Sequence, residues 1–180
     1  VVALCDILPA QIDKQKEKWT DVCADAAAFT DYRQMLAETD LDICCLCAYG
    51  DTRLEHTEAC LERGLHVFME KPVGFDAAEA RRFKFLAGKY PHLKTAVAYT
   101  LRYAGEWMSL RALIRNGTIG QIYTAQLTYC HAVHQGDEPA AADGSPRPVR
   151  LTDKAGNYVA PSQLVHDTHP WDMARYLFGE

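Results

Sequence analysis

Short apolar runs alternate with longer segments of mixed polarity along the first part of the chain. The apolar runs span residues 1–5, 41–48, 67–69 and 95–99. The segments with the length and composition of helices span residues 9–19, 31–39, 52–63, 76–89 and 103–116. The longest run, at residues 41–48, is almost wholly apolar, as in strands that helices cover on both faces. Strands that alternate with helices predict a doubly wound parallel sheet with right-handed crossovers.

Several residues mark where these elements begin and end. Thr30 and Asp31 are placed to cap the helix that follows them, with Met35 and Leu36 on its inner face. Gly64 follows the helix at residues 52–63 and suits a helix C-cap. Residues 21–29 are predicted to form a short connection.

The pattern changes after Gly120. Residues 121–131 alternate between two faces, which predicts a longer strand of an open antiparallel sheet. Residues 132–160 are polar, contain Gly and Pro, and predict a long loop. Residues 163–177 predict an amphipathic helix whose packing residues are Trp171, Ala174, Tyr176 and Leu177. The chain opens on a strand and ends without a closing element, so we expect both termini to be incomplete and the isolated chain to aggregate.

Composition excludes several classes of partner. The chain has 180 residues, of which 48% are hydrophobic and 24% charged, as in ordinary globular proteins. A net charge of −5 offers no basic field to nucleic acid or to anionic lipid. No apolar run approaches the roughly 20 residues of a membrane span. We expect a cytoplasmic protein, while the expected loss of the N-terminus leaves export open.

The cysteines do not suggest a disulfide framework. There are seven, an odd number. Three of them, Cys44, Cys45 and Cys47, lie in one apolar run. Buried reduced thiols explain this pattern better than disulfides, and no paired CxxC spacing for zinc is present.

Charged residues follow two of the predicted strands. Glu70, Lys71 and Pro72 come directly after residues 67–69, at the carboxyl end where open parallel sheets bind their ligands. A solvated Glu–Lys pair in a loop is the alternative. Asp6 ends the first run and could accept hydrogen bonds from an adenosine ribose, which favours NAD over NADP, or it could simply cap a turn. The glycine-rich phosphate loop expected roughly 20 residues before such an acid is not in this sequence.

A second polar cluster lies near the end of the chain. His169 and Asp172 are three residues apart and share a helix face. A neutral imidazole beside a carboxylate is a suitable general base near neutral pH. The alternative is an exposed His at a helix N-terminus that Asp167 or Thr168 caps.

A metal site is not expected. Cys130, His131 and His134 lie close together, with His166 and His169 further along the chain. On a strand, His131 and His134 point to opposite faces and cannot share an ion.

Ordered blocks across nearly the whole chain resemble the Gfo/Idh/MocA oxidoreductases, the family of glucose–fructose oxidoreductase and inositol dehydrogenase. The blocks span residues 1–6, 29–36, 41–43, 59–72, 101–103, 116–120 and 169–179. They include Glu-Lys-Pro at residues 70–72 and His-Pro-Trp-Asp at residues 169–172.

The resemblance implies a two-domain α/β protein that is longer than this chain. Residues 1–100 would form a Rossmann-type dinucleotide-binding domain that lacks its first strand and glycine-rich loop. Residues 101–180 would begin a substrate and oligomerisation domain with an open, mostly antiparallel sheet. Because that sheet often forms the subunit interface in the family, a homo-oligomer is expected.

The resemblance also implies roles for individual residues. Lys71 would lie close to both the nicotinamide and the substrate hydroxyl, and Pro72 would follow a cis peptide bond. His169 would take the hydroxyl proton while Lys71 polarises the oxygen and hydride passes from the carbinol carbon to the cofactor. The expected cofactor contacts are Asp6, Ala48, Tyr49, Arg53, Glu70, Lys71 and Thr100. The expected substrate contacts are Arg102, His166, Asp167 and Asp172.

Three positions depart from the family pattern. Residues 48–50 are Ala-Tyr-Gly where the family usually has Thr-Pro and then Asn. Arg53 stands where the family often has His. Val165 stands where inositol dehydrogenase-like members have Asp, and His166 or Asp167 could take its place.

Three functions follow as hypotheses. The first is an NAD-dependent dehydrogenase that acts on a sugar, a cyclitol or a related polyol. The second is a glycosidase of the same family that oxidises its substrate transiently and cleaves it by elimination, with residues 132–160 shaping a glycan site. The third is a non-catalytic ligand-binding or partner protein, because fold does not determine function.

Overall fold

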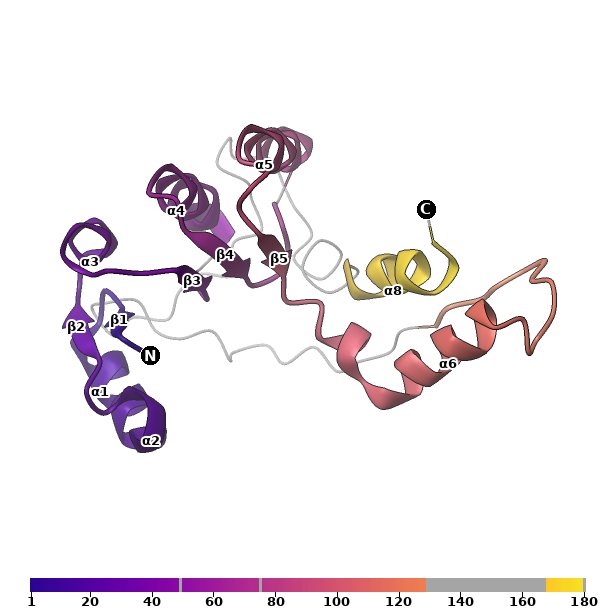
Figure 1. The fold of residues 1–180 in the computed structure, drawn as a ribbon, viewed down its shortest axis with the longest axis horizontal. Helices are drawn as coiled ribbons and strands as arrows, with labels where there is room; N and C mark the ends of the chain where they lie inside the picture. Colours follow the sequence, from indigo (N-terminus) through magenta and orange to yellow (C-terminus); the bar gives the residue numbers. More distant parts are fainter. Residues whose placement is uncertain (49, 75, 129–167, 180) are drawn as a thin grey trace.

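The computed structural model describes residues 1–48, 50–74, 76–128 and 168–179 (Figure 1). Its strands are β1 (Ala3–Cys5), β2 (Ala27–Phe29), β3 (Ile43–Leu46), β4 (His66–Met69) and β5 (Thr95–Val97). Its first helices are α1 (Pro9–Lys18), α2 (Thr20–Cys23), α3 (Tyr32–Glu38), α4 (Gly50–Glu62) and α5 (Ala77–Lys89). They are followed by the 3-10 helix η1 (Thr100–Tyr103) and by α6 (Gly105–Arg115) and α8 (Thr168–Phe178).

The described strands form two parallel sheets, β1–β2 and β3–β4–β5. Ala3 pairs with Ala27 in the first sheet, and Val67 pairs with both Cys44 and Thr95 in the second. Every strand pair is parallel and every connection between paired strands contains a helix. The predicted α/β fold with a parallel sheet is therefore confirmed.

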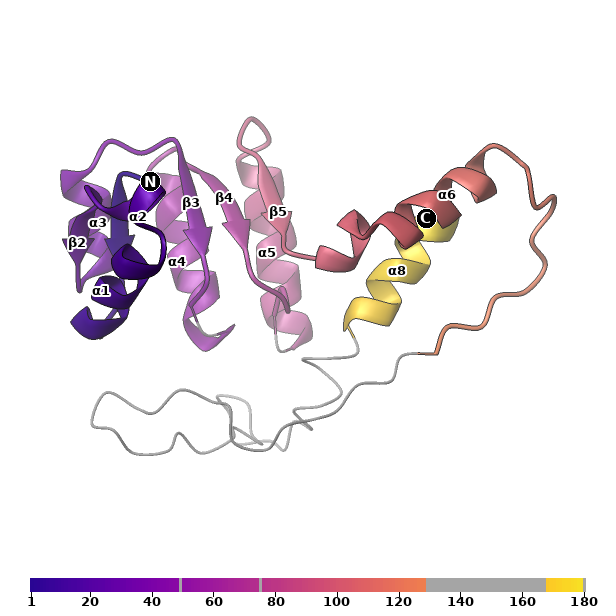
Figure 2. The ribbon, with the colours of Figure 1, turned by 90° about the horizontal axis from the view of Figure 1, so that it is seen from below.

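Helices cover the two sheets unequally (Figure 1). α3, α4 and α5 lie side by side along one face, whereas α1 and α2 lie on the opposite side, next to β1 and β2 (Figures 1 and 2). Burial alternates along β3, and Ile43 is 54% exposed. The prediction that helices cover both faces is therefore wrong for β3 and β4 within the described residues.

One apolar core lies between the sheets and α3, α4 and α5. Its buried members are Met35, Leu36, Cys44, Leu46, Cys60, Leu61, Leu65, Val67, Met69, Phe83 and Leu86. Burying each of the larger side chains contributes about 1.5–3 kcal/mol. This core holds β3, β4 and β5 in register and so determines where their carboxyl ends lie.

The predicted helix boundaries have the expected chemistry. The Asp31 side chain accepts a hydrogen bond from the backbone N–H of Arg33 (2.7 Å), which confirms the predicted cap of α3. Asp76 caps α5 by accepting from the N–H groups of Ala78 and Glu79 (2.7 and 2.8 Å). Gly64 has φ +84°, a conformation that favours glycine at a helix C-cap.

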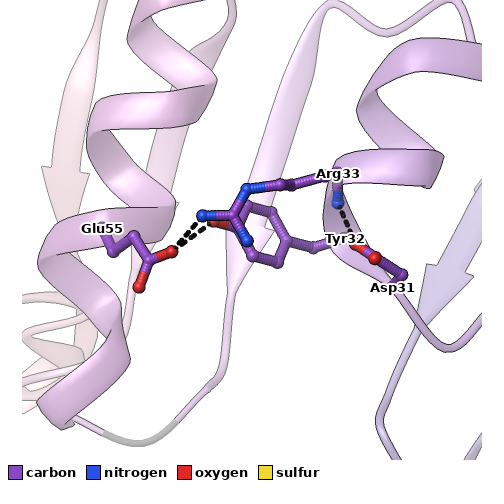
Figure 3. A network of polar contacts seen from close by, with 4 residues as sticks. All are labelled: Asp31, Tyr32, Arg33 and Glu55. Carbon is purple, nitrogen blue, oxygen red and sulfur yellow. Dashed lines mark hydrogen bonds and ion pairs between the residues drawn. The ribbon is translucent and has the colours of Figure 1, made fainter.

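A polar contact joins α3 to α4 (Figure 3). The Tyr32 hydroxyl donates to Glu55 Oε1 (2.8 Å), and Arg33 forms an ion pair with the same oxygen. The Tyr32 and His56 rings lie 4.2 Å apart between centroids. The contact connects a helix beside β1–β2 with a helix beside β3–β4, two sheets between which no strand pairing is described.

Residues 21–29 are not the connection that was predicted. They contain most of α2 and all of β2, a strand of only three residues. Ala27-Ala28-Phe29 is too short to show a hydrophobic period, and it becomes a strand through its parallel pairing with β1.

The prediction about the thiols is correct in part. The six described cysteines are all free, and Cys23, Cys44 and Cys60 are buried. Cys45 and Cys47 are exposed: Cys45 lies on the uncovered face of β3, and Cys47 directly follows that strand. Cys130 lies outside the described residues.

The strand predicted at residues 121–131 is wrong for residues 121–128, which have no regular secondary structure. A strand needs hydrogen bonds to a neighbouring strand, and no described segment pairs with these residues. Residues 129–131 and the loop predicted at 132–160 lie outside the described residues.

Helices α6 and α8 lie side by side beyond β5 (Figure 2). Arg111 Nε of α6 donates to the backbone oxygen of Tyr176 of α8 (2.8 Å). α8 begins at Thr168, and the predicted start at residues 163–167 lies outside the described residues. Trp171 is 74% exposed, so its predicted packing is wrong, whereas the predicted packing of Leu177 is confirmed. The buried face of α8 also carries Asp172 and Met173. None of the described helices has the length and apolarity needed to cross a bilayer.

Candidate active site

The carboxyl ends of β3, β4 and β5 meet at one edge of their sheet, because the strands are parallel (Figure 2). The backbone N–H of Glu70 donates to the backbone oxygen of Leu46 in β3 (2.9 Å between nitrogen and oxygen). The backbone N–H of Ala98 donates to the backbone oxygen of Met69 in β4 (2.8 Å). These bonds align the segments that leave the three strands, as expected for a ligand site at this edge.

The Glu70–Pro72 turn directly follows β4. The Lys71–Pro72 peptide bond is cis, as the family resemblance implied. The Glu70 carboxylate accepts a hydrogen bond from the backbone N–H of Lys71 (3.1 Å). Burial lowers the pKa of Lys71, Glu70 opposes that shift, and the positive charge of Arg53 adds to it. A half-buried amine with a lowered pKa is the kind of group that donates to, or exchanges protons with, a substrate oxygen.

Arg53 comes from the first turns of α4 and is 4% exposed. Its guanidinium donates to the backbone oxygen of Ala48 (3.0 Å) and to that of Pro72. The pKa of Arg53 is lowered by burial, against the opposing charge of Glu70. Arg53 thus connects the end of β3 with the turn after β4. Its predicted contact with the cofactor stays a prediction.

The second part of the site combines η1 with α8. Arg102 Nε donates to Asp172 Oδ2 (2.7 Å), and a second guanidinium nitrogen donates to Oδ1. Asp172 is only 7% exposed, and its hydrogen bond raises the pKa of Arg102. The sequence predicted both residues as substrate contacts. The structure brings them together as a forked ion pair that fixes α8 to η1.

His169 lies at the start of α8, with its Nδ1 atom buried. Its ring meets the Tyr99 ring edge-on, with 6.2 Å between centroids. Tyr99 follows β5 closely, so this contact places His169 beside the segment that leaves the sheet edge. Burial, with a smaller contribution from Asp172, raises the pKa of Tyr99. The pairing of His169 with Lys71 in catalysis stays a prediction.

Asp6 follows β1 and also takes part in a local turn. Its Oδ1 accepts a hydrogen bond from the backbone N–H of Leu8 (2.8 Å), which is the N-cap residue of α1. The second carboxylate oxygen, Oδ2, is the acceptor that a ribose hydroxyl would use. The cap and the ribose contact are therefore compatible, and the ribose contact stays a prediction.

The structure says less about the roles of the other predicted site residues. Ala48 contributes its backbone oxygen to Arg53, and Thr100 is exposed at the start of η1. Tyr49, His166 and Asp167 lie outside the described residues. So do Cys130, His131 and His134, and the described residues hold no cluster of three metal-binding side chains.

Tyr99 is the site residue that the sequence did not reveal. It was counted as the last residue of the strand predicted at residues 95–99, whereas β5 ends at Val97. A polar aromatic residue at the end of an apolar run was the available signal. Only the position of α8 shows that its ring meets His169.

Comparison with known proteins agrees with this geometry. The family described as "Oxidoreductase family, NAD-binding Rossmann fold", GFO_IDH_MocA, matches residues 1–99. The chain belongs to this family. The resemblance drawn from the sequence blocks is therefore confirmed, and with it the Rossmann fold of the first part of the chain.

Several curated relatives of the chain are named as dehydrogenases. It is 24% identical over 178 residues to myo-inositol 2-dehydrogenase of Thermotoga maritima, covering 99% of this chain and 47% of that protein. It is 32% identical over 125 residues to D-glucoside 3-dehydrogenase of Escherichia coli, covering 68% of this chain and 34% of that protein. The chain thus spans less than half the length of these relatives.

Solved structures show the same fold. An oxidoreductase domain protein from Kribbella flavida aligns with a TM-score of 0.73 at 23% identity, over 98% of this chain and 44% of that one. Scyllo-inositol dehydrogenase from Lactobacillus casei, solved with NAD(H) and scyllo-inositol, aligns with a TM-score of 0.61 at 24% identity, over 67% of this chain and 34% of that one.

Proposed function

We propose that the full-length protein is an NAD-dependent oxidoreductase that transfers a hydride between a sugar, cyclitol or related polyol and the nicotinamide. The observation that carries the proposal is the half-buried Lys71, with a lowered pKa, at the carboxyl end of β4 in a chain of this family. The relatives named as inositol and glucoside dehydrogenases support a polyhydroxylated substrate.

Residues at the carboxyl ends of β1 and β4 fit a nicotinamide dinucleotide. Asp6 offers a carboxylate oxygen after β1, and Lys71 offers an amine after β4. When bound, the nicotinamide accepts the hydride from the carbinol carbon or returns it. The acceptor at Asp6 would repel a 2′-phosphate, so NAD is proposed in preference to NADP.

Two side chains of this chain would handle the substrate hydroxyl. Lys71 polarises the hydroxyl oxygen by donating from its ammonium group, and His169 takes the hydroxyl proton. The Arg102–Asp172 pair holds α8 against η1 and so keeps the His169 imidazole in place. Holding both groups in a defined position is where much of the rate of such a reaction arises.

The organisation of the full-length protein is also proposed. A boundary near residue 100 between a dinucleotide-binding domain and a substrate domain is supported by the family match, which ends at residue 99. A homo-oligomer and a cytoplasmic location stay predictions from the sequence.

The test measures NADH formation by the full-length protein over a panel of inositols, hexoses and glucosides. We expect turnover with at least one polyol, and a loss of about 10²–10⁴-fold in kcat for Lys71→Ala and for His169→Ala, the range typical of acid–base groups. Arg115→Ala, at the far end of α6, is the control and should retain activity.

Two other results would identify the alternatives. Release of an aryl leaving group from a glycoside without net NADH would indicate the glycosidase. Binding of NAD without any turnover would indicate a non-catalytic protein. The named relatives among the comparisons are dehydrogenases or oxidoreductases, which supports neither alternative.

A further inference from the structure

We propose that Arg53 is a positioning residue for Lys71: it ties the turn after β4 to the end of β3 and places a fixed positive charge at the turn that carries Lys71. The inference depends on the proposed function in one respect only, namely that Lys71 donates to the substrate oxygen. The position of Arg53, its partners and its charge are properties of the structure itself.

The first observation is the burial of Arg53. Its residue exposure is 4%, which is rare for a charged side chain, and burying a cation is costly unless hydrogen bonds compensate. The two hydrogen bonds described for its guanidinium both go to backbone oxygens, those of Ala48 and Pro72. Its Nε atom is also buried. A side chain that only solubilised the surface of α4 would not be placed in this way.

The second observation is which backbone groups Arg53 joins. Ala48 follows β3, and Pro72 is the last residue of the turn that carries Lys71. The guanidinium is planar and presents several donors in a rigid fork, so one Arg can hold two acceptors at a defined separation. A Lys offers a single point charge on a flexible stem, and a His is shorter. Arg53 therefore limits the movement of the turn relative to the neighbouring strand.

The third observation is electrostatic. Three influences act on Lys71: burial lowers its pKa, Glu70 raises it, and Arg53 lowers it. Glu70 also acts on Arg53: burial lowers the pKa of Arg53, and the negative charge of Glu70 raises it. Arg53 thus offsets part of the effect that Glu70 would otherwise have on the Lys71 amine. Removing the charge of Arg53, while Glu70 remains, should raise the pKa of Lys71.

Two substitutions separate the charge of Arg53 from its fork. Arg53→Gln removes the charge and keeps one amide donor. Arg53→Lys keeps the charge and loses the fork. Arg63→Gln is the matched control, because Arg63 directly follows the same helix and its Nε donates to the backbone oxygen of Leu36 (3.0 Å), away from β4. Circular dichroism and thermal unfolding establish that each full-length variant is folded.

The primary measurement is the pH dependence of Lys71 acetylation by trace acetic anhydride, followed by peptide mass spectrometry. Only the neutral amine reacts, so the profile reports the titration of Lys71 without cofactor or substrate. We expect R53Q to shift the midpoint upward by about 0.5–1 pH unit, a change of about 3- to 10-fold in the protonation equilibrium. R53K and R63Q should stay within about 0.2 unit of the native protein.

The second measurement is steady-state turnover. We expect kcat to fall about 10-fold or more in both R53Q and R53K, with KM changed less than about 3-fold, because a misplaced amine impairs the reacting geometry more than binding. The basic limb of the kcat/KM profile should move upward in R53Q alone. R63Q should retain the native kcat and the native profile.

Several results would overturn the proposal. If R53Q folds and its Lys71 titration is unshifted, the electrostatic role of Arg53 is excluded. If R53K keeps the native kcat, the role of the two hydrogen bonds from the guanidinium is excluded. If R53Q does not fold, R53K alone decides, since it must combine an unshifted titration with a reduced kcat. If the native protein oxidises no polyol, the labelling still tests Arg53, so failure of this inference and failure of the proposed function can be told apart.

Discussion

At the scale of single residues, the site depends on where charge is buried. Arg53 and Asp172 are 4% and 7% exposed, and each makes hydrogen bonds to other groups of the chain. Arg53 lies beside the turn that carries Lys71, and Asp172 lies one helical turn after His169. The two residues proposed for the chemistry thus each lie close along the chain or in space to a buried charged residue.

Substitution of Asp172 tests the role of one of these two buried charges. Asp172→Asn leaves the Arg102 fork without its carboxylate, and we expect the unfolding free energy to fall by about 1–3 kcal/mol in urea denaturation. This is below the usual cost of breaking a fully buried pair, because the Arg102 side chain is 39% exposed. Activity should fall as well, because the position of His169 depends on α8.

A more exposed ion pair supplies the control for that experiment. Arg82 pairs with Glu58 with side-chain exposures of 45% and 29%. Glu58→Gln should cost less than about 1 kcal/mol and leave activity unchanged. Equal losses in the two variants would show that the Arg102–Asp172 pair has no special part in holding α8.

At the scale of elements, helix-to-helix contacts supply a connection that strand pairing does not. The described strands β1 and β3 are not paired with each other, while Tyr32 and Arg33 of α3 both bind Glu55 of α4 (Figure 3). The donors lower the pKa of Glu55, and burial together with the Glu55 hydrogen bond raises the pKa of Tyr32 to about 12. This contact therefore links stability to pH.

The sign of that linkage follows from the raised pKa of Tyr32. The folded state holds the phenol proton more tightly than the unfolded state, so its contribution to stability is complete below pH 10 and is lost as the pH rises toward about 12. We expect the difference in unfolding free energy between the native protein and Tyr32→Phe to shrink over this range. A difference that stays constant from pH 9 to 12 would contradict the assignment.

At the scale of the whole molecule, the sheets leave apolar surface uncovered among the described residues. Ile43 of β3 and Phe68 of β4 are 54% and 37% exposed on the face opposite α4 and α5. Helices α6 and α8 lie together beyond β5, next to the sheet edge with the Glu70–Pro72 turn (Figure 2). Apolar strand faces and unpaired strand edges are sites of self-association.

The 180-residue chain by itself should therefore associate in solution. We expect dynamic light scattering of the isolated chain to show particles much larger than its 20.2 kDa mass. A double variant, Ile43→Lys and Phe68→Lys, should reduce that association, because both side chains are on the exposed face. Lys substitution at the exposed Thr118, outside this face, is the control, and a monodisperse native monomer would contradict the prediction.

Much of the first part of the fold could be predicted from local sequence. Caps at Asp31 and Gly64, the β4 run and the lengths of α1, α3 and α5 depend on short-range chemistry, which the sequence displays directly. The position of the Glu70–Pro72 turn at a strand end was likewise predicted from the sequence. The Ala27–Phe29 strand was missed because it has too few residues to show a period and exists through pairing with β1.

The predictions from sequence were wrong where they had to say which face of a strand or helix is buried. Apolar composition at residues 41–48 suggested burial on both sides, but which helix covers which face depends on the path of the whole chain. Trp171 was predicted to pack but is 74% exposed, whereas α8 turns Asp172 and Met173 inward beside Leu177, whose packing was predicted correctly. The alternation at residues 121–128 predicted a two-faced strand, but these residues have no regular secondary structure, because a strand also requires a partner.

The sequence by itself determined the family, the alternation of strands and helices, and the presence of Lys71 and His169 in their motifs, because these depend on residue order and local chemistry. Only the tertiary structure decided that Arg53 is buried across two strand ends, that Arg102 and Asp172 form one ion pair, and that Tyr99 meets His169. These contacts join residues 19 and 70 positions apart along the chain. Such contacts arise from how parallel strands and their helices pack together, which no local pattern encodes.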